Sequence, residues 1–202
     1  MSFDLYLASQ SPRRKELLES MGLQLKCCPA DIDETASAGE SPQDYVQRLA
    51  LEKAKTAYAN ISKPVKNIPC LGADTIVACN GELFGKPKNK QDAQRMWHAM
   101  SASQHQVLTA IAVVCEVLNE GSNELREQTA LSLNQVSFKK VTDDEMDIYW
   151  QSGEPQDKAG AYGIQGRASA WIESIQGSYT GIMGLPLYET NEALKHYGLN
   201  WL

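Results

Sequence analysis

The chain has 202 residues, 43% of them hydrophobic, and a formal net charge of -6. This composition is typical of a packed globular protein and excludes a disordered chain. The acidic balance argues against a nucleic-acid-binding module and against attachment to an anionic membrane, because both depend on a basic face. The sequence also lacks the apolar run of about 18 residues that a membrane-spanning helix needs.

The cysteines predict a reducing compartment. Cys27, Cys28, Cys70, Cys79 and Cys115 are odd in number and form neither a C-x-x-C pair nor a zinc-binding spacing. Most lie in apolar stretches, where cysteine packs as a small hydrophobic residue. The first residues, "MSFDLYLAS", lack the basic region and the long apolar run of a signal peptide. We therefore expect a cytoplasmic protein.

Capping and turn signals divide the chain into alternating strands and helices. We expect strands at residues 3–8, 24–29, 104–118, 127–140 and 169–174, a hairpin at 68–87 that turns at Asn80-Gly81, and helices after Ser11, after Ser41, near 90–101, after Thr142 and near 186–197. The sequence contains no internal repeat and no low-complexity linker. These features predict an α/β protein with a single domain over residues 1–202.

The first predicted helix begins with a concentration of positive charge. Ser11 is placed to cap it, Pro12 suits its first position, and Arg13, Arg14 and Lys15 follow. A helix N-terminus is already positive because of its unpaired N–H groups and its macrodipole. The three cations are therefore either solvated surface side chains or part of a site in which N–H groups and arginines bind an anion together.

Two charged residues interrupt apolar patterns further along the chain. Lys53 falls within the apolar stripe that runs from Val46 to Ala57 on the second predicted helix. Its ammonium must extend along that face to solvent or meet an anion. Asp74 interrupts the apolar strand "CLGADTIVAC", where a carboxylate is costly unless it is paired or binds a metal. Asp74 is therefore either a satisfied structural residue or part of a site.

These unusual positions share one chemistry. Donors and positive charge come from Ser9, Arg13, Arg14, Lys53 and Lys86, and carboxylate oxygens come from Asp74 and from Glu34 in the acidic loop "DIDETASAGE". Mg²⁺ prefers one or two carboxylates together with phosphates and waters, while Lys and Arg neutralise the remaining phosphate charge. The glycine-rich segment "DKAGAYGIQG" matches no phosphate-loop pattern and adds only a weak signal. The residues alone predict an enzyme that acts on a phosphate ester or anhydride with a divalent cation.

Seven ordered motifs carry a resemblance to a known family. They are "LASQSPRRKELL", "DIDE", "RLALEKA", "GADTIV", "GKP", "DKAGAYGIQG" and "GLPL", and they run over essentially the whole chain. In these motifs the sequence resembles the Maf nucleotide pyrophosphatases.

The resemblance implies a fold and an activity. The expected fold is a Maf or ITPase-like α/β fold, in which a mixed twisted sheet flanked by helices borders a deep nucleotide-binding cleft. The expected activity is metal-dependent hydrolysis of nucleoside triphosphates between the α and β phosphates, which releases the monophosphate and pyrophosphate. The implied cofactor is Mg²⁺ or Mn²⁺. Because many members of the family are dimers, a homodimer is expected.

The resemblance also assigns roles to the unusual positions. It implies that Ser9, Arg13 and Arg14 bind the phosphates, that Glu34 and Asp74 hold the metal and the attacking water, and that Lys53 and Lys86 stabilise the charge that develops on the phosphates. Asp74 is the expected general base. Two carboxylates that share a metal titrate as a coupled set, so the alternative that Glu34 takes the proton stays open.

Three further positions distinguish branches of the family that the chain resembles. The branch acting on dTTP and UTP carries Arg, Thr and Gln where the 7-methyl-GTP branch carries Trp, Gln and Glu. Here these positions are Arg13, Thr75 and Gln165, which match the pyrimidine branch. A Gln amide offers both a donor and an acceptor, as the N3–H and carbonyls of uracil and thymine require.

The sequence therefore predicts a dTTP/UTP pyrophosphatase, with modified pyrimidine nucleotides as further candidate substrates. The alternatives are a 7-methyl-GTP pyrophosphatase of the same family and a nucleotide-binding regulator of cell division. The complete set of carboxylates and lysines favours an enzyme over a regulator, because binding alone requires no water-activating base.

Overall fold

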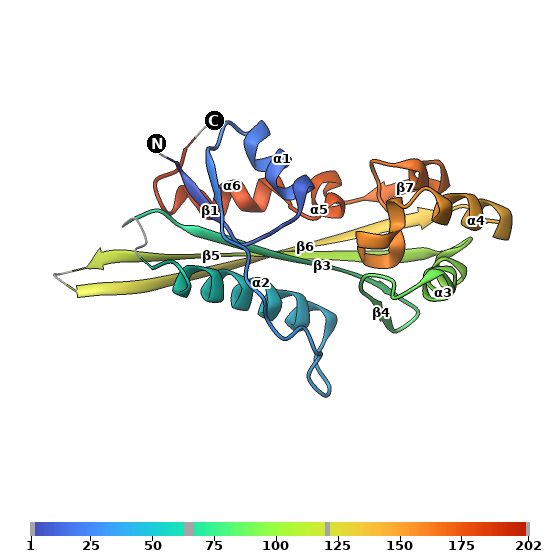
Figure 1. Cartoon of the computed structure of the whole chain (residues 1–202), viewed down its shortest axis with the longest axis horizontal. Helices are drawn as coiled ribbons and strands as arrows, with labels where there is room; N and C mark the ends of the chain where they lie inside the picture. The colour runs from blue at the N-terminus through green and yellow to red at the C-terminus, as the bar shows by residue number, and fades with distance from the viewer. Residues whose placement is uncertain (1–2, 63–66, 120–121, 201–202) are drawn as a thin grey trace. The chain divides into compact units, whose positions relative to one another are not determined.

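A computed structural model describes residues 3–62, 67–119 and 122–200 of the chain. Its strands, labelled in Figure 1, are β1 (Leu5–Leu7), β2 (Leu25–Cys27), β3 (Cys70–Cys79), β4 (Glu82–Phe84), β5 (Gln104–Asn119), β6 (Ser122–Phe138) and β7 (Ile172–Gln176). Its α-helices are α1 (Pro12–Ser20), α2 (Pro42–Ala59), α3 (Lys90–Met100), α4 (Asp143–Gln151), α5 (Tyr179–Met183) and α6 (Leu187–Lys195). Short 3-10 helices are η1 (Glu154–Asp157), η2 (Ala159–Ala161) and η3 (Arg167–Trp171). Of the helices in the described part of the chain, none combines the length and the apolar character that crossing a membrane requires.

The described strands form one mixed sheet, as predicted. Its order is β2-β1-β3-β5-β6-β7, and β4 pairs with β3 beside this path. Strand β1 lies parallel to both β2 and β3, whereas β3 pairs with β4 and β6 pairs with β7 in the antiparallel direction. The predicted α/β class is confirmed.

The predicted hairpin and most predicted helix starts are confirmed. Cys79 pairs with Glu82, so Asn80 and Gly81 form a two-residue turn, and their φ angles of 51° and 81° suit it. The Ser41 side chain accepts a hydrogen bond from the Asp44 N–H at the start of α2. Thr142 and Glu145 form both halves of a capping box on α4.

Several predicted details are wrong. Strand β6 begins at Ser122 rather than 127, and its first residues are mostly polar and carry no alternating pattern by which the sequence could predict them. The strand expected at 169–174 begins only at Ile172, after η3. Helix α5 was not predicted, since five residues leave no helical period to detect. Ser11 does occupy the N-cap of α1, but its side chain makes no capping hydrogen bond.

The chain folds into two compact units, each assembled from separate segments. The first unit comprises Met1–Asp74, Thr109–Ser132 and Gly184–Leu202, and the second comprises Thr75–Leu108 and Leu133–Met183. Strands β3, β5 and β6 contribute residues to both units. The predicted single domain over residues 1–202 stays a prediction.

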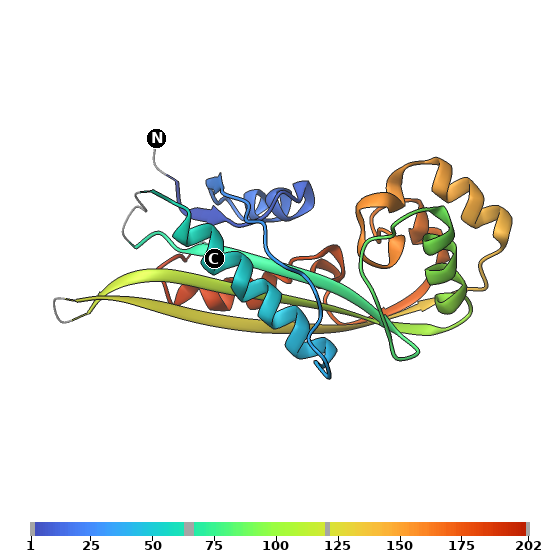
Figure 2. The same ribbon diagram turned by 60° about the horizontal axis from the view of Figure 1, so that its bottom comes forward.

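In the first unit, helices cover both faces of the strands. Figures 1 and 2 show α2 on one face and α6 on the other. On the α2 side, the Tyr58 hydroxyl accepts a hydrogen bond from the Glu116 N–H at 3.1 Å. The Tyr197 hydroxyl, just after α6, donates to the Val113 carbonyl at 3.4 Å. These contacts fix both helices to β5.

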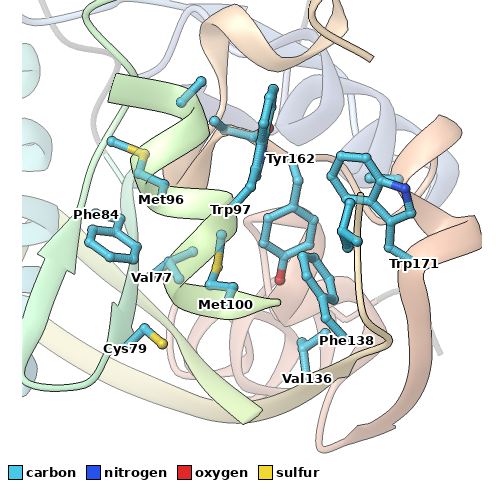
Figure 3. Packing of buried hydrophobic residues seen from close by; sticks show 14 of the residues in the cluster. Val77, Cys79, Phe84, Met96, Trp97, Met100, Val136, Phe138, Tyr162 and Trp171 are labelled. Carbon is cyan, nitrogen blue, oxygen red and sulfur yellow. The ribbon is translucent and has the colours of Figure 1, made fainter. Parts of the chain in front are cut away.

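The core of the second unit is rich in aromatic rings, shown in Figure 3. The Trp97 ring lies 5.5 Å from Tyr149 and 5.6 Å from Trp171, measured between ring centroids. The indole N–H of Trp97 also donates to the Ala161 carbonyl at 2.9 Å. Helix α3, which carries Trp97, therefore anchors the glycine-rich segment that the sequence singled out.

Candidate active site

Two carboxylates meet one ammonium in the first unit. Asp74 ends this unit's share of β3, Lys53 lies on α2, and Glu34 lies in the loop between β2 and α2. The Lys53 Nζ is 2.6 Å from Oδ1 of Asp74 and 2.6 Å from Oε1 of Glu34. Asp74 is only 8% exposed, whereas the Glu34 side chain is 58% exposed. Lys53 thus meets anions instead of extending to solvent, and Asp74 is a paired buried carboxylate.

Gly72 explains how α2 comes close enough to make this cluster. A Cβ at Gly72 would overlap backbone atoms of Ala50 and Ala54 on α2, so only glycine fits there. Asp74 lies two residues further along β3 and therefore on the same face of the strand. The close approach of helix and strand brings Lys53 within reach of Asp74.

Two residues of α2 hold the Glu34 loop in place. The Tyr45 hydroxyl donates to the Glu34 carbonyl at 2.8 Å, and the Arg48 guanidinium donates to the Thr35 carbonyl at 3.1 Å. Arg48 also forms a two-pronged ion pair with Glu40 at 2.6 and 2.8 Å. Sequence reasoning missed Tyr45 and Arg48, because their roles depend on the backbone carbonyls that they reach.

The electrostatics of the cluster favour a carboxylate that binds a proton readily. Burial raises the pKa of Asp74, the Lys53 ammonium and the Arg14 guanidinium oppose that rise, and the Glu34 charge adds to it. Burial likewise lowers the pKa of Arg14, with Asp74 and Glu34 acting in the opposite direction. The start of α1 therefore lies within electrostatic range of both carboxylates.

The start of α1 is organised around Ser9 and Arg14. The Ser9 hydroxyl oxygen accepts hydrogen bonds from the Ser11 N–H at 3.1 Å and from the Arg14 guanidinium at 3.4 Å. The Nε–H of Arg14 donates to the Gly184 carbonyl at 2.8 Å. Arg14 and its neighbour Arg13 are both half-buried, so neither is a fully solvated surface cation.

The remaining predicted site residues belong to the second unit. Thr75 is half-buried and directly follows Asp74 on β3, whereas Lys86 and Gln165 are exposed. The Gly160 N–H donates to the Gly85 carbonyl at 3.0 Å, which ties the segment before Lys86 to the glycine-rich segment that carries Gln165. The predicted meeting of these three residues with the cluster of the first unit stays a prediction.

Comparison with known proteins assigns the family. The model of the family described as "Maf-like protein" matches residues 4–197. The chain belongs to the Maf family. It is 47% identical to a dTTP/UTP pyrophosphatase of Chromobacterium violaceum, over 96% of this Maf chain and 94% of the relative. It is 45% identical to one of Hydrogenovibrio crunogenus (95% and 94%) and 46% identical to one of Cupriavidus pinatubonensis (98% of each).

The two carboxylates that meet at Lys53 suit a hard divalent cation. Within residues 3–62, 67–119 and 122–200, no group of three or more His, Cys, Asp or Glu side chains forms a metal-binding cluster. Two carboxylates, Glu34 and Asp74, nevertheless converge on one positive charge, the Lys53 ammonium. Two carboxylates are also the number that Mg²⁺ takes when substrate phosphates and waters complete its coordination. The residues present therefore fit the cation that the sequence predicted.

Proposed function

We propose that this Maf chain hydrolyses dTTP and UTP to the monophosphate and pyrophosphate, with modified pyrimidine nucleotides as further substrates. Relatives named dTTP/UTP pyrophosphatase, 40–47% identical over nearly the whole chain, support this substrate class. The observation that carries the chemistry is the convergence of Asp74 and Glu34 on the Lys53 ammonium. A buried carboxylate beside a fixed positive charge suits water activation next to a phosphate anhydride.

Asp74 acts as the general base in this proposal. Its carboxylate accepts the proton of the attacking water, and the burial that raises its pKa strengthens it for that task. The Lys53 ammonium orients the carboxylate and stabilises negative charge on the phosphates as it develops. Glu34 is the alternative base, because its carboxylate meets the same Lys53 ammonium.

Glu34 and Asp74 would hold a divalent cation, Mg²⁺ or Mn²⁺. When bound, such an ion lowers the pKa of water and polarises phosphoryl oxygens. Ser9, Arg13 and Arg14 bind the phosphates at the start of α1, and Lys86 supplies a further positive charge. The anion expected from the basic opening of α1 is, in this proposal, the triphosphate.

Base recognition falls to Thr75 and Gln165, and Arg13 is the third position that matches the pyrimidine branch. The Gln165 amide can donate to a base carbonyl and accept from N3–H, the pair that uracil and thymine present. Cytosine offers an unprotonated N3 beside an amino group, so the same amide orientation cannot satisfy it. We therefore expect UTP and dTTP to be preferred over CTP.

A substrate panel tests the proposal. Hydrolysis of dTTP, UTP, CTP, GTP and 7-methyl-GTP is followed with Mg²⁺ or Mn²⁺, and pyrophosphate and orthophosphate are measured separately. Pyrophosphate from dTTP and UTP supports the proposal. A preference for 7-methyl-GTP overturns the base assignment. Absence of turnover with either metal, combined with nucleotide binding, favours a nucleotide-binding regulator of cell division instead.

The Asp74→Asn variant separates catalysis from binding. Loss of the carboxylate charge should lower turnover by about 10²–10⁴-fold, the range for a general base, while nucleotide binding persists. Retained turnover contradicts the role given to Asp74. If any effect on cell division survives in this variant, that effect is independent of hydrolysis.

We infer a cytoplasmic homodimer, in which the two compact units of each chain fold together as one domain. Light scattering on the purified chain measures its mass against 22.3 kDa for a monomer. Unfolding followed by far-UV and near-UV signals gives coincident transitions if the units unfold together and separate ones if they do not.

A further inference from the structure

The carboxylate of Glu154, in the second unit, is a hydrogen-bond acceptor on both of its oxygens. Its Oε1 accepts from the Tyr149 hydroxyl at 2.7 Å, and its Oε2 accepts from the Arg167 N–H at 3.0 Å. Glu154 is half-buried and begins η1. Glu154 has no part in the chemistry described above. Its two partners, Tyr149 and Arg167, lie before and after it in the sequence.

Tyr149 connects this carboxylate to the aromatic core. It is 2% exposed, and its ring lies 4.9 Å from Trp171 and 5.5 Å from Trp97, measured between centroids. Its hydroxyl donates to Glu154 and accepts from the Gly163 N–H at 3.1 Å. Glu154 and Tyr149 thus form one rigid pair, which reaches from the core to the glycine-rich segment.

The pair holds both ends of the turn from Gly163 to Gly166. Tyr149 binds the N–H of Gly163, Glu154 binds the N–H of Arg167, and the Gly166 N–H closes the turn on the Gly163 carbonyl at 3.2 Å. A Cβ at Gly166 would overlap the Glu154 carboxylate, which therefore lies directly against the turn backbone. The turn is shaped by this carboxylate.

Gln165 is the residue that the turn presents. It is exposed, while Ile164 on its one side is buried and Gly166 on its other side packs against Glu154. An exposed amide on a backbone that is held at both ends keeps a defined position, which hydrogen-bond recognition of a base requires.

We propose that Glu154, together with Tyr149, is a positioning residue for Gln165 and thereby sets the preference for a base with an N3–H between two carbonyls. This inference rests on the proposed function. Glu154 touches neither substrate nor cation in this role. Its loss should weaken discrimination between bases while hydrolysis at the Asp74 cluster continues.

Two variants test the pair. In Glu154→Gln, one oxygen becomes an NH₂ group that cannot accept, so either Tyr149 or Arg167 loses its acceptor. In Tyr149→Phe, both Glu154 and Gly163 lose their partner. We expect the ratio of kcat/KM for UTP over CTP to fall about tenfold in each variant, the size of one lost hydrogen bond. The effect should appear as a higher KM for UTP with a smaller change in kcat.

The matched control is Glu173→Gln, the same change at an exposed position of β7. It should leave both the ratio and the melting temperature unchanged. The double variant Glu154→Gln/Gln165→Ala should discriminate no worse than Gln165→Ala alone, because both changes act through one amide. Additive losses, or an unchanged UTP/CTP ratio in Glu154→Gln, overturn the positioning role.

A further readout separates this inference from the proposed function. In Glu154→Gln, amide hydrogen exchange should accelerate at least tenfold at Arg167 if that N–H loses its acceptor, or at Gly163 if the Tyr149 hydroxyl loses its acceptor, whatever the enzyme hydrolyses. If the wild-type chain turns over no nucleotide, the proposed function fails, and the binding ratio of UMP over CMP replaces kcat/KM. Unchanged exchange, or an equal binding ratio in wild type and variant, overturns the inference itself.

Discussion

The Lys53 ammonium and the Asp74 carboxylate lie 2.6 Å apart although 21 residues separate them in the chain. Lys53 bridges Asp74 to Glu34, so one ammonium is paired with two carboxylates that differ in their exposure. A buried carboxylate deprived of such a partner is expected to bind a proton instead of keeping its charge.

Lys53→Met, which keeps length and removes charge, tests this relationship. We expect kcat/KM to fall about 10²–10³-fold, as for the loss of a charge-stabilising donor. The Lys53 charge lowers the pKa of Asp74, so its removal should raise that pKa further. Activity should then be lost at a higher pH as the solution is acidified. Lys55→Met, on the same helix but paired with Glu127, should retain wild-type rates and the wild-type pH profile.

The contacts of Arg48 with Glu40 and with the Thr35 carbonyl predict that activity depends on the position of the loop that carries Glu34. Arg48→Lys keeps the charge but loses the fork that binds Glu40 and the Thr35 carbonyl, so Glu34 should be less well placed. We expect kcat/KM to fall about tenfold. The free energy of unfolding should change by about 1 kcal/mol, because lysine keeps an ion pair with the half-buried Glu40 and loses about one hydrogen bond. Arg95→Lys, a comparable surface arginine paired with Asp92, should keep full activity. An equal loss in both variants would contradict a specific role for Arg48.

Gly72 predicts a large packing effect. Gly72→Ala should lower the free energy of unfolding by about 3 kcal/mol or more, because the added methyl meets the α2 backbone, which has no rotamer by which to yield. Gly85→Ala, where no atom lies within 4 Å of the added Cβ, should change it by less than about 0.5 kcal/mol. Urea unfolding of both variants decides the point. Similar midpoints for the two would mean that α2 does not pack closely on β3.

His105 predicts acid sensitivity of the second unit. It is 2% exposed, its Nε2 lies 2.8 Å from the Tyr162 hydroxyl, and burial lowers its pKa from 6.5 to about 4. Between about pH 6.5 and pH 4, His105 binds a proton in the unfolded chain but not in the folded chain. The neutral His105 therefore contributes about 3 kcal/mol to the free energy of unfolding. This contribution is complete above about pH 6.5 and is lost as the pH falls to about 4.

His105→Gln removes this titration and keeps a polar side chain beside Tyr162. The free energy of unfolding, measured in urea at intervals from pH 8 to pH 4, should fall more steeply for the wild type than for the variant. Parallel curves for the two proteins would show that His105 is not the group responsible.

Much of the fold could be predicted because its signals are local. Asn80-Gly81, Ser41-Pro42 and the Thr142 capping box each determine backbone geometry within a few residues, and all three are present as expected. Strand β6 began earlier than predicted because its first residues are mostly polar and carry no alternating side-chain pattern that would mark them as a strand. The division into two units could not be predicted from the sequence either, because each unit is assembled from distant segments.

The candidate site shows the same contrast. Lys53 and Asp74 were detectable because a charge in an apolar pattern is locally anomalous. Their mutual contact was not, because it depends on Gly72 and on how closely a helix packs. Arg48 and Glu154 escaped notice for a related reason. Their importance lies in the backbone groups they bind, and a sequence does not reveal which carbonyl or N–H a side chain reaches.

The bond from Arg14 to the Gly184 carbonyl has a consequence for biosynthesis. Its two partners are 170 positions apart in the chain, and the first unit includes the segment Gly184–Leu202. At the usual pace of translation, roughly 10–30 s pass between the emergence of these two partners from the ribosome. Throughout that interval the face of the first unit's strands that α6 covers in the folded protein (Figures 1 and 2) lacks this helix. This protein should therefore depend on chaperones during its synthesis more than its modest size suggests.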